Sequence, residues 1–356
     1  MFAIATWLLW LVAATAAPAN SVNGPPPNAL EIYFIDVEGG QSTLVVTPAG
    51  ESLLIDAGFP STGTFQSRAG DPANARDTQR IVVAAHAAGL TRIDYLVVTH
   101  FHADHAGGVA ELAQVMPIGT FIDHGDLAPE AERAVPGTQL VFEEYTGARA
   151  KGRHLVPRVG DRLPVRGLEA TVVSTGGLTL TKALPGAGQR NAVCADSARP
   201  PQEAQENPRS IGIRVQFGKF TFLDLGDLTG EPLFKLVCPR DLIGPVDVYV
   251  VPHHGGPDAA DPAMLAAFRP RVAIVNNGAT KGGAPEVFAS LRQAPGPIDV
   301  WQLHRSDIPG AENFQADRLA NLDDRTAYWI TLSANDDGSF RLQNARTGAE
   351  RRYSAR

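Results

Sequence analysis

Apolar residues are spaced along this chain in two ways, and each spacing predicts a different element. Short runs rich in β-branched and aromatic residues predict strands, and they occupy residues 31–37, 42–47, 51–55, 94–98, 120–123, 168–173, 211–217, 219–225, 246–252, 272–276, 298–303, 327–333 and 339–343. Apolar positions three and four residues apart predict amphipathic helices, and they occupy residues 74–88, 109–116, 138–151, 231–237 and 262–268. The strand and helix signals continue without a break, so the pattern predicts one domain over residues 30–345.

Several stretches lack both spacings. Residues 1–17 hold an apolar run that ends in small residues, which is typical of a secretory signal peptide. An uncleaved anchor is the alternative, but the run is shorter than the about 20 apolar residues of a spanning helix. Residues 18–29 are rich in proline and asparagine and predict a linker. Residues 174–209 predict a long loop that acts as a lid, residues 306–325 a polar loop, and the end of the chain from Arg351 a frayed tail.

Composition narrows the classes of partner. With 356 residues, of which 44% are hydrophobic, the chain can bury a large core. Its formal net charge of −7 gives no attraction for a polyanion, so nucleic acid is not favoured as a partner. The two cysteines, Cys194 and Cys238, would pair in an exported protein and stay reduced in a cytosolic one. Composition leaves these two alternatives open, as it does the oligomeric state.

The predicted strand at residues 94–98 runs into a dense group of metal-binding side chains. His100, His102, Asp104 and His105 form the pattern His-x-His-x-Asp-His, followed by two glycines and a helical stretch. Neutral imidazole and carboxylate groups suit Zn²⁺ and similar divalent ions. In a tight loop the first two histidines point to one side, and the aspartate and the last histidine to the other. This geometry favours two metal ions.

With this motif in place, the chain resembles the metallo-β-lactamase superfamily over roughly residues 30–305. More narrowly, it resembles the branch that includes the hydrolase-like domain of the ComEC DNA-uptake proteins. Further stretches carry the resemblance: Asp36-Val-Glu-Gly-Gly-Gln-Ser, Leu54-Ile-Asp-Ala-Gly58, Leu225-Gly-Asp227 and Pro252-His-His-Gly-Gly256. The resemblance implies an α+β fold, the four-layer αββα sandwich, in which loops at strand ends converge on the metal ions.

The resemblance also implies roles for individual residues. His100 and His102 would hold one ion, while Asp104, His105 and His253 would hold a second. Asp227 would bridge the two ions, and Asp104 would also relay a proton. His254 is interpreted as a neighbour of the second ion that contacts substrate or acts as an acid. Asp56 would support the metal loop by hydrogen bonding without binding metal.

The chain departs from the superfamily pattern in two places. Residues 206–213 contain no histidine where many members supply a third ligand to the first ion; Asn207 and Ser210 stand there, as in the ComEC-like branch. Water, His124 or partial occupancy are the alternatives for that ligand. His124 follows a predicted strand, where it would be a ligand, a substrate contact or an ordinary turn residue. His304 also lies at a strand end, where it would have a place in the substrate pocket or be an ordinary strand-end residue.

The second departure lies in residues 277–285. The branch often carries a histidine before the proline of this loop, and Ala284 replaces it here. Lys281 would supply a positive group in its place, or else be a solvated loop lysine.

These observations predict an exported hydrolase, periplasmic or secreted, with two divalent ions as cofactors, zinc or alternatively manganese. A water shared by two such ions loses a proton near neutral pH and becomes the nucleophile. The expected substrate is a small molecule or ester, first a phosphodiester or other phosphate ester, and alternatively a lactone or amide. A non-catalytic binding protein with a degenerate metal site is the third alternative. No membrane span is expected once the signal peptide is removed.

Overall fold

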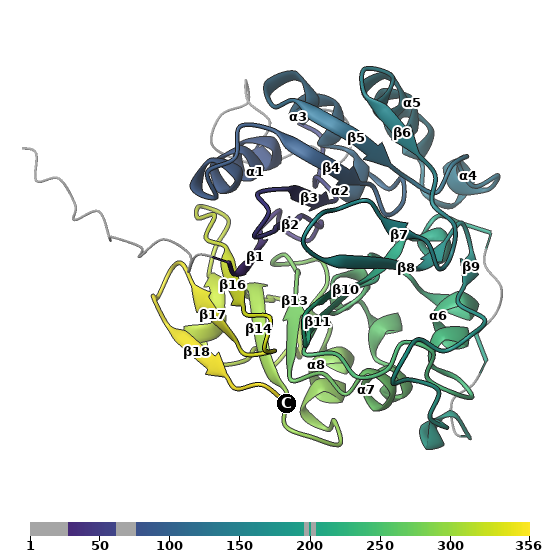
Figure 1. Cartoon of the computed structure of the whole chain (residues 1–356), viewed down its shortest axis with the longest axis vertical. Helices are drawn as coiled ribbons and strands as arrows, with labels where there is room; N and C mark the ends of the chain where they lie inside the picture. Colours follow the sequence, from purple (N-terminus) through teal and green to yellow (C-terminus); the bar gives the residue numbers. More distant parts are fainter. Residues whose placement is uncertain (1–27, 62–75, 196–198, 201–203) are drawn as a thin grey trace, which may run out of the picture.

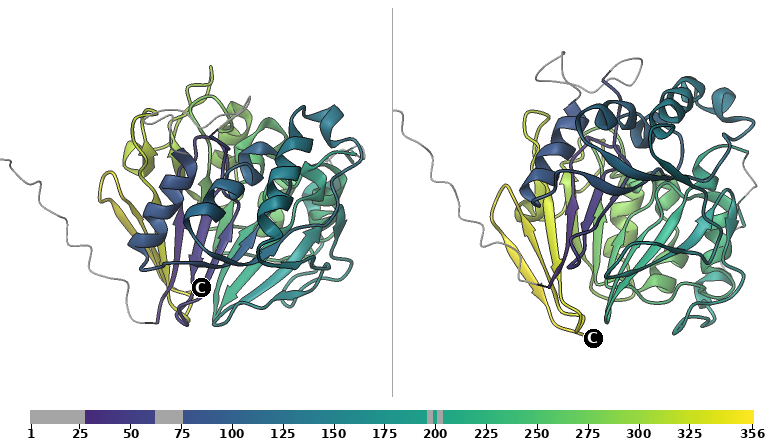
Figure 2. Two further views of the ribbon diagram at one scale, coloured as in Figure 1. Left: turned by 90° about the horizontal axis from the view of Figure 1, so that it is seen from above. Right: turned by 45° about the horizontal axis from the view of Figure 1, so that its top comes forward.

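The computed structural model describes residues 28–61, 76–195, 199–200 and 204–356. The predicted signal peptide and most of the predicted linker lie outside these residues. Two nine-stranded sheets pack face to face, and helices cover the outer face of each (Figures 1 and 2). This arrangement is the four-layer αββα sandwich of the metallo-β-lactamase fold. The predicted fold is therefore confirmed.

The first sheet carries both ends of the described chain. Its strands, in spatial order, are β18 (Glu350–Tyr353), β17 (Phe340–Asn344), β16 (Ile330–Ala334), β1 (Leu30–Phe34), β2 (Thr43–Val46), β3 (Ser52–Ile55), β4 (Ile93–Val97), β5 (Ile118–Ile122) and β6 (Arg153–Leu155). Its helices are α1 (Arg76–Ala87), α2 (Ala103–Ala106), α3 (Val109–Val115), α4 (Ala131–Ala134) and α5 (Thr138–Arg149). Strands β3 to β6 run parallel, so their carboxyl ends lie at one edge of the sheet.

The second sheet is formed by the later part of the chain. Its strands, in spatial order, are β15 (Leu319–Asn321), β14 (Asp299–His304), β13 (Val272–Val275), β12 (Val248–Val250), β11 (Phe220–Asp224), β10 (Gly212–Phe217), β8 (Glu169–Thr175) and β7 (Arg162–Leu163), and β9 (Leu178–Thr179) pairs with β8. Its helices are α6 (Gly230–Val237), α7 (Pro262–Phe268) and α8 (Pro285–Arg292). Strands β11 to β15 are parallel, which again brings their carboxyl ends to one edge.

Alternation of side chains along the strands produces the layers. In β1, Ile32 and Phe34 enter the apolar layer between the two sheets, whereas Tyr33 faces the helices. Phe34 meets Phe222 of the second sheet with ring centroids 5.9 Å apart. A second apolar layer lies under α1, α3 and α5, and a third under α6, α7 and α8. The strands that bear the functional loops are therefore buried on both faces.

The structure differs from the predicted elements in several places, and one of them is β15, which lies within the predicted polar loop 306–325. Helix α8 was not predicted, although Pro285 at its first turn is a typical helix start. The predicted frayed tail instead contains β18, which pairs with β17. The described part of the predicted lid is fixed to the connection after α6 by backbone hydrogen bonds and by the disulfide between Cys194 and Cys238. Within the described ranges, the helices are all too short or too polar to cross a membrane.

Candidate metal centre

Four buried side chains converge where the carboxyl ends of the parallel strands of both sheets meet. Asp104, His105, Asp227 and His254 each offer one ligand atom, and these atoms lie within 4.8 Å of one another. Nε2 of His105 lies 3.1 Å from Nε2 of His254 and 3.2 Å from Oδ2 of Asp227. Nε2 of His254 lies 3.0 Å from Oδ2 of Asp104. Two imidazoles and two carboxylates facing one point form a donor set that fits a divalent ion.

Each ligand is placed by the end of a strand. Asp104 and His105 lie on the one-turn helix α2 after β4, Asp227 lies in the turn after β11, and His254 follows β12. His253 and His254 have φ values of 51° and 55°, and Asp56 has 60°. Left-handed backbone is unfavourable for these residue types and concentrates at functional sites. The turn after β12 therefore holds a strained conformation that directs His254 into the cluster.

Asp56 supports the cluster from behind. Its Oδ2 accepts a hydrogen bond from Nδ1 of His105 at 2.7 Å, and the backbone N–H of Thr99 donates to its Oδ1 at 2.7 Å. A carboxylate on one imidazole nitrogen fixes the ring and directs the other nitrogen towards a metal ion. Asp56 thus hydrogen-bonds to Thr99 and His105 of the predicted metal loop, and its role in supporting a metal ion stays a prediction.

Opposite charges face one another within the cluster. Burial by itself would raise the pKa of the Asp227 carboxyl, but His105 and His254 hold this pKa well below its usual range. Burial likewise opposes protonation of His105, yet the carboxylates of Asp227, Asp104 and Asp56 raise its pKa well above the ordinary value. The carboxylates are thus ionised. A bound cation would balance their negative charge in place of the protons on the imidazoles.

His100 and His102 lie beside this cluster. Nε2 of His100 is 3.0 Å from Nδ1 of His102 and 3.9 Å from Oδ2 of Asp227. Burial and the neighbouring imidazoles lower the pKa of His100 well below its usual value, so it is neutral and can act as a ligand. Nε2 of His102 is buried and has no hydrogen-bond partner among the described residues. These groups form a second, less complete set of ligands around Asp227.

His253 lies at the rim of the cluster. Its Nδ1 is 2.8 Å from the carboxylate of Asp258, and its Nε2 is 3.8 Å from Oδ2 of Asp227 and 3.3 Å from Nδ2 of Asn207. Although burial opposes it, the carboxylates of Asp227 and Asp258 raise the pKa of His253 to about 8. Its side chain is 31% exposed, whereas that of His254 is 1% exposed. The structure thus puts His254 where the sequence analysis expected His253, and the assignment of His253 as a ligand stays a prediction.

Lys281 adds a positive charge to the same opening. Its Nζ forms an ion pair with Oδ2 of Asp104 and donates to the carbonyl oxygen of Gly39 at 2.6 Å. It also lies 5.9 Å from the centre of the Phe59 ring. The side chain is 41% exposed. Of the two alternatives left open by the sequence, the structure therefore favours a positive group at the cluster.

The remaining predicted residues lie farther from the four ligands. Nε2 of His124 pairs with the carboxylate of Glu206 at 2.9 Å. The backbone oxygen of Ser210 accepts a hydrogen bond from Ser174, and Oγ of Ser210 is buried without a partner in the part of the chain that the structure describes. His304 is buried at the end of β14, and its Nδ1 donates to the backbone oxygen of Arg305 at 2.9 Å.

Sequence reasoning did not identify Glu206 or Asp258. The local sequence points to Glu206 only because it directly precedes Asn207. It points to Asp258 only because this residue follows His253 by five positions.

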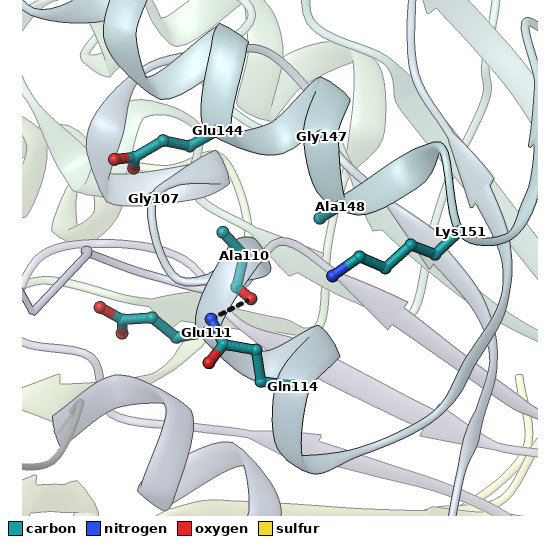
Figure 3. Close-up of a pocket in the computed structure, with 8 residues that line it drawn as sticks. All are labelled: Gly107, Ala110, Glu111, Gln114, Glu144, Gly147, Ala148 and Lys151. Atoms are coloured by element: carbon teal, nitrogen blue, oxygen red, sulfur yellow. Dashed lines mark hydrogen bonds between the residues drawn. The ribbon is translucent and has the colours of Figure 1, made fainter.

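A separate pocket lies between α3 and α5 and is distinct from the cluster (Figure 3). Its lining consists of Gly107, Ala110, Glu111, Gln114, Glu144, Gly147, Ala148 and Lys151. None of the four clustered ligands lines it, and its charged groups are of both signs. The metal centre is therefore the better candidate for the functional site.

One family model and several solved structures are similar to this chain. The family described as the metallo-beta-lactamase superfamily matches residues 35–189. No curated protein matches the chain. Similar solved structures include the metallo-beta-lactamase fold protein YhfI from Bacillus subtilis, with 10% identity, a TM-score of 0.45 and coverage of 77% of this chain and 96% of that chain.

Two others are CmlA, a diiron β-hydroxylase from Streptomyces venezuelae, and a putative metal-dependent hydrolase from Parabacteroides distasonis. CmlA has 16% identity, a TM-score of 0.44 and coverage of 78% of this chain and 53% of that chain. The putative hydrolase has 16% identity, a TM-score of 0.41 and coverage of 76% and 92%. The matched residues 35–189 contain the His-x-His-x-Asp-His motif, and the described residues form two facing sheets covered by helices. The chain is therefore similar to the metallo-beta-lactamase superfamily over residues 35–189 and has the fold of that superfamily.

Proposed function

We propose that this protein is an exported, metal-dependent hydrolase that acts on small phosphate esters, first of all phosphodiesters. The observation that carries the proposal is the buried set Asp104, His105, Asp227 and His254, with Lys281 paired to Asp104 at its opening. The set supplies ligands for a divalent ion, and the lysine supplies a positive charge for an anionic substrate.

The ligand sets support two ions that share Asp227. One would be held by Asp104, His105, Asp227 and His254, and the other by His100, His102 and Asp227. Zinc suits these imidazole and carboxylate ligands, and manganese is the alternative. When bound, such ions lower the pKa of a coordinated water to about 7 and polarise the oxygen under attack.

The residues around the ions favour an anionic substrate. Lys281 and His253 have side chains 41% and 31% exposed, so both are accessible to a ligand that enters the cluster. An ammonium group stabilises phosphate oxygens as a point charge. The net charge of −7 disfavours long polyanions, which points to a small ester. A simple lactone lacks the charge that Lys281 would bind, whereas a β-lactam carries a carboxylate, so the substrate screen must include both.

The positions of His253 and His254 favour an exchange of the roles that the sequence suggested for them. His254 is buried among the ligands, whereas His253 is held by Asp258 at Nδ1 and keeps Nε2 facing the side of Asp227. We therefore propose that His254 binds metal. His253 would hold a proton at Nε2 and give it to the leaving oxygen, with Asp258 orienting the ring.

The disulfide supports export of the protein. Cys194 and Cys238 are the chain's two cysteines, and they are bonded to each other. Disulfides persist in the periplasm and outside the cell and are rare in the cytosol. Together with the predicted signal peptide, this favours a periplasmic or secreted protein.

The motifs at Asp36–Ser42 and Pro252–Gly256 favour the ComEC-like branch.

Metal analysis of the purified protein, combined with a substrate screen, tests the proposal. The screen would contain bis(4-nitrophenyl) phosphate, a lactone and a β-lactam. We expect about two equivalents of metal and turnover of the phosphodiester that is lost with a chelator and restored by added metal. Turnover of the lactone alone would mean that the substrate is a lactone and not a phosphate ester. Less than one equivalent of metal, without turnover of any substrate after metal addition, would favour the binding-protein alternative.

A further inference from the structure

The segment that lacks the third histidine carries a buried carboxylate instead. Glu206 precedes the short 3-10 helix at Asn207–Arg209 and is 0% exposed. A carboxylate without contact to water is costly to bury unless hydrogen bonds and charges compensate for the lost hydration. The contacts of Glu206 therefore indicate what the residue does.

The carboxylate of Glu206 accepts hydrogen bonds from three separate parts of the first half of the chain. The backbone N–H of Phe101 donates to Oε2 at 3.0 Å, and Nε2 of His124 donates to the same oxygen at 2.9 Å. The backbone N–H of Ala128 donates to Oε1 at 2.7 Å. Burial by itself would raise the pKa of Glu206, but the contact with His124 and the two backbone N–H groups lower this pKa below its usual value. Glu206 is therefore a buried anion.

The contact with Phe101 matters because this residue separates His100 from His102. Five residues after Glu206, the backbone N–H of Ile211 donates to the carbonyl oxygen of Thr99 at 2.9 Å. The segment from Glu206 to Ile211 thus holds the backbone on both sides of His100. The two imidazoles of the incomplete ligand set are positioned by this clamp.

We propose that Glu206 is a positioning residue for the first metal ion: it fixes the backbone between His100 and His102 and places a negative charge beside them, where a third histidine ligand is absent. The inference rests on the proposed function, since it requires the ion that these two histidines would hold. His124 donates the hydrogen bond that keeps Glu206 in place. It is therefore a positioning residue as well, and not a metal ligand.

The test is the substitution Glu206→Gln, which keeps the size of the side chain and removes the charge and one acceptor oxygen. Zn²⁺ would be titrated into the metal-free full chain in competition with a chelating indicator, and Co²⁺ absorption would report the ligand sets separately. Removing groups that orient metal ligands costs about 10- to 100-fold in metal affinity. We expect a loss of this size for the weaker ion, and a change of less than about twofold for the tighter ion.

Two further variants separate positioning from general stability. His124→Asn cannot reach Glu206, and it should weaken the same ion in the same direction; it also provides the test if Glu206→Gln does not fold. Asp247→Asn is the matched control, because Asp247 is 3% exposed and its carboxylate accepts two hydrogen bonds from Thr221. Asp247 lies before β12, at the opposite end of that strand from His254. This control should lower the melting temperature without changing either affinity.

Three outcomes would overturn the inference. Unchanged affinity for both ions in Glu206→Gln, in a wild-type protein that binds two, would reject the role of Glu206 and leave the proposed function intact. Equal weakening of both ions, with the same loss of melting temperature as in Asp247→Asn, would mean that Glu206 only stabilises the fold. A wild-type protein that binds a single ion would reject the dinuclear centre and, with it, this role.

Discussion

The ammonium group of Lys281 forms an ion pair with Asp104, a carboxylate that also faces His254 and His105. A lysine from the loop after β13 thus competes for one of the ligands of the proposed second ion. The same lysine is accessible from solvent, since its side chain is 41% exposed. This single contact links metal affinity to substrate recognition, and both effects can be measured.

We expect Lys281→Met to bind the second ion more tightly than the wild type, because a neighbouring positive charge no longer opposes the cation. The same change should raise the Michaelis constant for a phosphodiester more than it lowers kcat, because a group that binds the anion is lost. Metal titration and steady-state kinetics measure the two effects. Lys235→Met on α6 is the matched control, since Lys235 pairs with Glu231 at the surface. Unchanged values for Lys281→Met would assign Lys281 to the solvated loop.

Asp227 is the residue whose loss should be most severe. It lies within 4 Å of ring nitrogens of His100, His105, His253 and His254. We expect Asp227→Ala to reduce hydrolysis to the buffer rate and to lower the metal content, since both ligand sets use this carboxylate. Circular dichroism should show a folded protein. A folded, metal-loaded and active variant would refute the bridging role.

Asp56→Asn tests the support of the metal loop. The amide has a single acceptor oxygen, so its NH2 group must face either the backbone N–H of Thr99 or the Nδ1–H of His105, and the contacts that orient the His105 ring are weakened. The expected result is a loss of about 10- to 100-fold in affinity for the second ion, measured by chelator competition. Weakening of the first ion alone would contradict the position of Asp56 behind His105.

The residues that the sequence identified share one property: they lie in local motifs. His100, His102, Asp104 and His105 fall within one loop, and Asp227 and the histidine pair each follow a strand that is recognisable from its apolar run. Hydrophobic spacing also predicted most of the strands, because each faces the core on at least one side. The fold and the centre of the site were predictable for this reason.

The remaining features depend on contacts between distant segments. Lys281 lies 177 residues from Asp104, and Glu206 lies 105 residues from Phe101. The spacing of residues within one segment cannot indicate contacts between residues so far apart in the sequence. The choice between His253 and His254 was also out of reach, because two adjacent side chains are distinguished only by the left-handed backbone of the turn. Strand β18 was missed because the polar sequence Glu-Arg-Arg-Tyr lacks the apolar alternation of a strand.

The histidine pair gives the sharpest prediction about the chemistry. His254→Gln should lose the second ion, because a ligand that is 1% exposed and lies 3.0 Å from Asp104 is removed. His253→Gln should keep its metal and lose turnover, because the proton donor is removed. The defect should be smaller for a substrate whose leaving group is already acidic, such as 4-nitrophenolate, than for one with an alkoxide leaving group. Metal loss in His253→Gln with metal retained in His254→Gln would restore the assignment made from the sequence.

The disulfide gives a prediction about stability that does not depend on the metal centre. Cys194 and Cys238 are 44 positions apart, and closing a loop of this length stabilises a protein by about 4 kcal/mol in the chain-entropy model. The double variant Cys194→Ala, Cys238→Ala should therefore show a free energy of unfolding about 4 kcal/mol lower in guanidinium chloride. The wild type should lose a similar amount when reduced, and its metal content should not change, because the bond joins the loop before β10 to the end of α6, away from the four ligands. If the reduced and oxidised wild type unfold at the same denaturant concentration, the disulfide is not formed in the native protein, and the argument for export loses its structural support.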